Sequence, residues 1–152
     1  MRFLFYWGPV LAVGALISVA STGHFGSAHT SRIIIPMLRW IFPHAQQRTL
    51  EFIHHLIRKG AHVFEYSVFS ALVWRAIRFG RDGWRWSWAG WTVVVVAGFS
   101  LLDEFHQSFV PGRGASVLDS LLDTCAGALA LLVLWQIVRW RTEPREGRQQ
   151  KV

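Results

Sequence analysis

Charged residues are missing from long stretches of this 152-residue chain. Phe3–Ser21 and Trp86–Leu102 contain no Asp, Glu, Lys or Arg, and 117–138 contains only Asp119 and Asp123. Apolar stretches of about 18–22 residues match a hydrocarbon core of roughly 30 Å, because a helix rises about 1.5 Å per residue. A soluble domain of this size rarely contains several such stretches. The sequence therefore predicts an all-α integral membrane protein, since helices satisfy their own backbone hydrogen bonds in lipid.

Other absences narrow the possible functions. The chain has a single cysteine, Cys125, which excludes an intramolecular disulfide and leaves the compartment open. No compact metal motif such as HExxH is present, so no cofactor is expected, although the carboxylates leave a divalent cation as an alternative. The 16 basic residues outnumber the 9 acidic ones, but they flank the apolar stretches. This pattern indicates contact with anionic membrane lipids and no nucleic-acid partner.

The hydropathy pattern predicts a bundle of four transmembrane helices, with an interfacial helical segment between the first and the second. Pro36 and Pro43 argue against a clean span in the first connector, where an amphipathic helix would lie in the membrane interface. "SVA" at 18–20 leaves open a cleaved signal peptide in place of the first helix. The expected divisions are a first helix at 1–21, a connector at 22–58, a three-helix core at 59–140 with spans at about 60–79, 86–109 and 117–140, and a basic tail at 141–152.

The distribution of basic residues predicts the orientation of these spans. Arginines cluster between the second and third spans and again beside the tail, whereas the connector between the third and fourth spans holds only Arg113. The positive-inside rule then places both termini in the cytoplasm of a bacterial cytoplasmic membrane. The first connector, with Arg32, Arg39, Arg48 and Arg58, cuts against this orientation. On balance we expect the charged stretch between the third and fourth spans to face the extracytoplasmic side.

Polar residues recur at helical spacing near the extracytoplasmic ends of three predicted spans. At about 100° per residue, each set falls on one face of its helix. A charge at the bilayer centre costs about 2.5–3.5 kcal/mol on insertion scales, so these faces should meet one another or a watery cavity. The candidate catalytic residues are Glu65, His62, Glu104 and Asp119. The candidate substrate-binding residues are Lys59, Tyr66, Asp103, Gln107, Arg113 and Asp123.

The motifs "KGAHVFEY" and "DEFHQSFVPGRGASVLDSLLDTCAG" resemble those of the VanZ-like membrane proteins, named for a protein linked to teicoplanin resistance. The resemblance covers roughly Lys59 to Leu132. The family pattern is K-x-x-H-x-x-E-Y, then E-x-x-Q, P-G-R and D-x-x-x-N-x-x-G. Asp123 stands where the family usually has Asn, and Val63 where it often has Phe, so this chain has a carboxyl group in place of the family's side-chain amide.

The resemblance implies a multi-pass protein of the bacterial envelope. We expect it to bind or modify an outer-leaflet cell-wall or lipid-linked component, and so to affect teicoplanin or envelope-stress susceptibility. Membrane lipids are expected partners, while the oligomeric state and the choice between binding and catalysis stay open. Two alternatives are a small proton-coupled transporter, whose polar faces would continue through the bilayer, and a structural protein held together by an inter-helix salt-bridge network.

Overall fold

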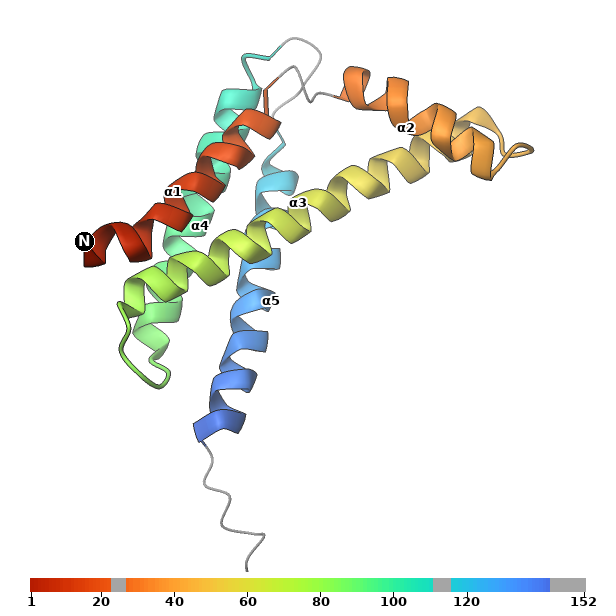
Figure 1. Ribbon diagram of the computed structural model, residues 1–152. Helices are drawn as coiled ribbons and strands as arrows, with labels where there is room; N and C mark the ends of the chain where they lie inside the picture. The colour runs from red at the N-terminus through yellow and green to blue at the C-terminus, as the bar shows by residue number, and fades with distance from the viewer. Residues whose placement is uncertain (23–26, 111–115, 143–152) are drawn as a thin grey trace, which may run out of the picture.

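The computed structural model describes residues 1–22, 27–110 and 116–142. This part of the chain forms five α-helices and no strand (Figure 1). The helices are α1 Arg2–Ala20, α2 Ser27–Ile41, α3 Gln47–Arg78, α4 Trp86–Gln107 and α5 Val117–Thr142. The expectation of an all-helical protein is therefore confirmed.

Three of these helices, α1, α4 and α5, are long and apolar enough to cross a membrane. They start at or within a residue of the predicted spans and end within two or three residues of them. The helix that contains the predicted second span, α3, is not among the three. Charged side chains are distributed along α3, including Glu51, Lys59, Glu65 and Arg75. Three apolar helices support a membrane protein.

The central helix of the fold is α3, which packs against all four of the others. It has 32 residues and runs through Lys59 and Gly60 without interruption, so it begins at Gln47 instead of near Gly60. At about 1.5 Å per residue its length is about 48 Å, which exceeds a bilayer core of roughly 30 Å. It ends where Phe79 and Gly80 adopt left-handed backbone angles, with φ of 51° and 79°.

A core of interlocking apolar side chains joins α1, α3 and α4. Val10 and Ile17 of α1 pack with Tyr66, Phe69 and other α3 residues, and with Val96 of α4. The α5 backbone also approaches closely, because Gly127 lies against Val96 and Ser70. Small residues permit this kind of close helix packing.

The end of the bundle that holds the α3–α4 connector is rich in tryptophan and arginine. Trp74 stacks on Trp84 with ring centroids 5.3 Å apart, and the Arg78 guanidinium lies 4.8 Å from the centroid of Trp74. Arg81 and Arg85 both lie over the ring of Trp88. Aromatic and basic residues together are typical of a membrane interface.

The amphipathic helix α2 packs along the N-terminal half of α3. Thr30 Oγ1 lies 3.1 Å from His54 Nε2, and Arg39 donates a hydrogen bond to the side chain of Gln47. Together α2 and the start of α3 extend away from the region where α1, α4 and α5 gather (Figure 1). The outward face of α2 is apolar, with Ile33 and Trp40 73% and 84% exposed.

Candidate functional site

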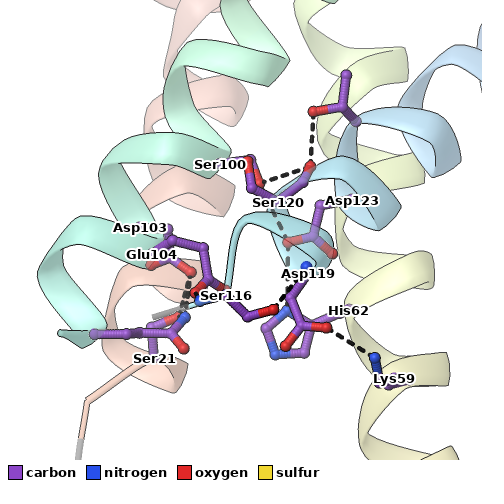
Figure 2. A network of polar contacts seen from close by, with 12 residues as sticks. Ser21, Lys59, His62, Ser100, Asp103, Glu104, Ser116, Asp119, Ser120 and Asp123 are labelled. Atoms are coloured by element: carbon purple, nitrogen blue, oxygen red, sulfur yellow. Dashed lines mark hydrogen bonds and ion pairs between the residues drawn. The ribbon is translucent and has the colours of Figure 1, made fainter. Parts of the chain in front are cut away.

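Polar side chains from four helices gather at the end of the bundle opposite the tryptophan-rich end. The C-terminal ends of α1 and α4 and the N-terminal end of α5 meet the middle of α3 there (Figure 2). In the described part of the chain, every buried carboxylate lies in this region, and we call this set the polar cluster. Its members on α3 are Lys59 and His62, on α4 Ser100, Asp103, Glu104 and Gln107, and on α5 and its cap Ser116, Ser120, Asp119 and Asp123, with Ser21 after α1.

Asp103 is buried and is held by neutral donors. The Ser21 hydroxyl donates a hydrogen bond of 2.7 Å to Asp103 Oδ2, and Gln107 Nε2 donates one of 2.8 Å to the same atom. Gln107 also donates to Ser21 Oγ at 3.2 Å, which closes a three-membered network. The other carboxylate oxygen, Oδ1, is buried and has no hydrogen-bond partner within the described residues. Burial removes the hydrogen bonds that this oxygen would form with water, so its desolvation cost is not offset by a bond to a described residue.

Asp123 occupies the equivalent place on α5, with its side chain 2% exposed. Its Oδ2 lies 3.3 Å from Ser100 Oγ, which donates to it, and 3.7 Å from His62 Nδ1. The second distance allows an ion pair when His62 is protonated, but it is too long for a hydrogen bond. Asp123 Oδ1 and the Tyr66 hydroxyl are also buried without a hydrogen-bond partner among the described residues. The polar cluster thus holds two buried carboxylate oxygens that accept no hydrogen bond from a described residue, and the Tyr66 hydroxyl in the adjoining core is a third such polar atom.

Glu104 and Ser116 fix the start of α5 against α4. The Ser116 backbone N–H donates to Glu104 Oε2 at 2.7 Å, and Ser116 Oγ accepts a 3.3 Å bond from the Asp119 N–H. Ser116 therefore acts as the N-cap of α5, where serine is a preferred residue. Asp119 in the first turn is favourably placed for the helix dipole.

Lys59 and Asp119 join α3 to α5 at the edge of the cluster. Lys59 Nζ donates to Asp119 Oδ1 at 2.8 Å, and the two side chains are 40% and 41% exposed. Pairs this exposed contribute roughly 0–1 kcal/mol. The pair can therefore open at little cost in stability.

A small cavity lies among these groups and leaves about 60 Å³ of space that water-sized molecules can reach. A single water needs roughly 10–15 Å³ by this kind of measure, so the cavity is large enough for a few waters or a small polar group. Every lining residue except Leu122 carries a polar or charged group. The lining residues are His55, Arg58, Lys59, His62, Glu104, Gln107, Asp119, Leu122 and Asp123.

Residues 3–139 of the chain match the model of the protein family described as VanZ/LLP1. This chain belongs to the VanZ/LLP1 family. The match is wider than the motif resemblance between Lys59 and Leu132, because it includes α1 and α2 of this VanZ/LLP1 protein. No match was found among curated proteins or among solved structures.

The structure brings together most of the residues that the sequence of this VanZ/LLP1 protein singled out. Lys59, His62, Glu104, Gln107, Asp119 and Asp123 line one cavity, and Asp103 lies behind it, bonded to Gln107.

Two of the candidates on α3 lie apart from the cavity. Glu65 faces α1 and does not line the cavity, while Tyr66 is fully buried in the core. Arg113 lies outside the described residues, as does the rest of "PGRG".

Two serines of the VanZ/LLP1 protein belong to the site but were not predicted from the sequence. Ser21 and Ser100 each donate to a buried carboxylate, although Ser21 precedes both VanZ-like motifs and Ser100 lies between them. Ser100 lies three and four residues before Asp103 and Glu104, so extending the polar face of α4 by one turn would have found it. Ser21 comes from a distant segment and gives no such signal.

Metal binding receives no support from the described part of the VanZ/LLP1 chain. None of its His, Cys, Asp and Glu side chains form a group of three that could hold a metal ion. The carboxylates of the polar cluster instead contact hydroxyl, amide and amine donors.

Proposed function

We propose that this VanZ/LLP1 protein crosses the bacterial cytoplasmic membrane four times, with α3 as a strongly tilted fourth crossing and both termini in the cytoplasm. The arginine- and tryptophan-rich end would then face the cytoplasm, in keeping with the positive-inside rule. The polar cluster would face the extracytoplasmic side. The apolar face of α2 would lie in the outer interface, as amphipathic helices do.

At that side, we propose, the polar cluster binds an outer-leaflet cell-wall or lipid-linked component and thereby changes susceptibility to teicoplanin. The observation that carries this proposal is the pair of buried carboxylates, Asp103 and Asp123, each with one oxygen that has no hydrogen-bond partner among the described residues. Ionisable groups inside a membrane are costly, and they mark functional sites by default. Their position beside an open polar cavity supports a binding role.

The geometry favours binding over catalysis. A general base needs hydrogen-bond contact with the group that orients it, and the 3.7 Å between His62 Nδ1 and Asp123 Oδ2 does not provide one. Ser100 and Ser116 already donate or accept bonds within the cluster. Neither serine contacts an imidazole that would activate it as a nucleophile.

Transport receives less support from the structure. In the described part of the chain, the buried polar residues away from the cluster are His54, which lies under α2, and Ser70 and Thr92, which both donate to helix carbonyls. A proton pathway through the bilayer would need ionisable or hydrated groups along its length.

A structural role is the second candidate, and a specific observation favours it. Several groups of the cluster bridge helices, as in the bonds between Lys59 and Asp119 and between Ser21 and Asp103. If these bonds only hold the bundle together, removing them should reduce stability without any separate effect on function.

The test is teicoplanin susceptibility of a sensitive bacterial host that expresses the wild type or Asp119→Asn. The Lys59–Asp119 pair is half-exposed, so its loss costs roughly 0–1 kcal/mol and the variant should accumulate normally in the membrane. We expect the wild type to protect the host and Asp119→Asn to lose most of that protection. Membrane abundance is measured by immunoblot in the same cultures.

The matched control is Asp82→Asn, because Asp82 is exposed in the connector at the opposite end of the bundle. It should protect as well as the wild type. Equal protection by Asp119→Asn and the wild type would contradict a binding role for the cavity. Loss of Asp119→Asn from the membrane would instead favour the structural role.

A further inference from the structure

An apolar groove of about 390 Å³ lies between α1 and α3, on a side of α3 different from that of the polar cavity. Its walls are aliphatic and aromatic except for one carboxylate, that of Glu65. The groove is open on one side, which would be the lipid-facing side in a membrane. The side chains that shape it are Leu16, Ile17, Val19, Phe64, Glu65 and Val68.

A second cavity of about 190 Å³ lies between the groove and the polar cluster. Ala20 and Glu65 line both the groove and this second cavity. Arg58 and His62 line both the second cavity and the 60 Å³ cavity of the polar cluster. The three hollows therefore adjoin one another, from an apolar surface, past Glu65, to the polar cavity between α3, α4 and α5. This is the shape that an amphiphile requires, with a hydrocarbon chain at one end and a head group at the other.

Glu65 determines which head group fits. It lies at the polar end of the groove, half-buried, and makes no hydrogen bond or ion pair with any residue in the part of the chain that the structure describes. A carboxylate at an apolar surface is costly without a donor. The head group should therefore carry a hydrogen-bond donor, and a cationic amine would satisfy Glu65 best.

The charges around the hollows point to the same conclusion. The described carboxylates in and beside them are Glu65, Asp103, Glu104, Asp119 and Asp123, while their permanent cations are Arg58 and Lys59. This excess of negative charge disfavours a purely anionic lipid.

We propose that the groove between α1 and α3 holds a hydrocarbon chain of an amine-bearing phospholipid, whose ammonium contacts Glu65 at the polar end of the groove. This inference rests on the proposed function, because it names the chemical class of the outer-leaflet component. It extends the site from the polar cluster to the surface of α1. It also gives Glu65, which lies apart from the cavity, a direct contact with the ligand.

The test is lipid retention by the full-length protein, purified in mild detergent and measured by native mass spectrometry. Phosphatidylethanolamine and phosphatidylglycerol are the probes, because they share a phosphate and differ in the amine. The wild type should retain the ethanolamine lipid in preference. Glu65→Gln should reduce this preference by about tenfold, as expected for the loss of a hydrogen bond to a charged group.

Two tryptophan substitutions of exposed valines separate the groove from the general lipid surface. Val19 lines the groove and is 53% exposed, whereas Val133 of α5 is 60% exposed and lies outside all three cavities. Val19→Trp should fill the groove and abolish retention of both lipids. Val133→Trp should behave as the wild type, which controls for the added bulk.

Either of two results would overturn the inference. One is equal retention of phosphatidylethanolamine by the wild type, Glu65→Gln and Val19→Trp. The other is a preference of the wild type for phosphatidylglycerol, which would refute the contact between an amine and Glu65. The assay needs no antibiotic, so its failure is distinguishable from that of the proposed function. A protein that retains the ethanolamine lipid selectively and gives no teicoplanin protection would uphold the groove and refute the proposed effect on susceptibility.

Discussion

At the scale of single residues, Gly127 determines how closely α5 approaches the rest of the bundle. A Cβ added there would lie 3.0 Å from Val96 Cγ1 and 3.2 Å from Ser70 Cβ. Both contacts involve atoms close to a backbone, so neither neighbour can move away easily. The Ser70 hydroxyl also donates to the Gly127 carbonyl at 2.9 Å, which fixes the distance between α3 and α5.

Gly127→Ala should therefore lower stability. Alanine improves helix propensity by about 1 kcal/mol, but overpacking costs roughly 1–3 kcal/mol, and the second effect should dominate. Gly98→Ala is the control, because no atom within 4 Å would meet its Cβ and only the gain in propensity remains. The measurement is the temperature of heat-induced aggregation in detergent, which should fall for Gly127→Ala and stay level or rise for Gly98→Ala. A rise for Gly127→Ala would show that α5 can shift outward.

Much of the candidate site could be predicted at the residue scale, because helical spacing fixes which side chains share a face. Asp119 and Asp123 are four residues apart on α5 and do line one cavity. Spacing does not fix the direction in which a face points when a helix has neighbours on several sides. This is why Lys59 and His62 reach the cavity, while Glu65 and Tyr66 on the same predicted face contact the groove and the core.

At the scale of helices, the docking of α2 onto α3 depends on His54. This side chain is 6% exposed and lies 3.1 Å from Thr30 Oγ1. Burial, with help from the neighbouring Arg58 and His55, lowers the pKa of His54 below its ordinary value of 6.5. The docked state therefore favours the neutral imidazole.

Docking of α2 should consequently weaken on acidification. The contribution of His54 is complete above its ordinary pKa of 6.5 and declines as the pH falls from there through the lower pKa of the docked state. Hydrogen exchange of α2 in detergent should be faster at about pH 5.5 than at about pH 7.5 after correction for intrinsic rates. His54→Gln should remove this dependence, whereas His55→Gln, at an exposed position, should keep it. The same dependence in both variants would assign the effect to another group.

The helix boundaries were predictable where charge-free stretches define them, as for α1, α4 and α5. The start of α3 was not, because its first turns are amphipathic and resemble a separate interfacial segment. Gly60 looked like a place to begin a helix, but a glycine inside a helix costs only about 1 kcal/mol, which packing against several helices can offset.

At the scale of the whole molecule, the orientation in the membrane can be tested with the chain's single cysteine removed. In a Cys125→Ala background, Phe109→Cys introduces a thiol just beyond α4, near the polar cluster, where the native side chain is 70% exposed. Asp82→Cys introduces one in the connector at the other end, where the native side chain is also exposed.

A membrane-impermeant maleimide added to intact spheroplasts should label Phe109→Cys several-fold more than Asp82→Cys, because only the first thiol would lie outside. Disruption of the membrane should make the two labelling levels equal. The reverse pattern would invert the proposed topology and place the polar cluster in the cytoplasm.

The bond from Ser21 to Asp103 joins residues 82 positions apart in the sequence, and it has a consequence for biogenesis. During synthesis, α1 is made long before α4. The Ser116 N–H, which donates to Glu104, is made later still, just before α5. A nascent chain that stops before α5 can already form the bonds from Ser21 and Gln107 to Asp103, but it lacks the N–H of Ser116 that donates to Glu104. Glu104 therefore gains this donor only when the last helix has joined the bundle, so the polar cluster is completed at the end of synthesis.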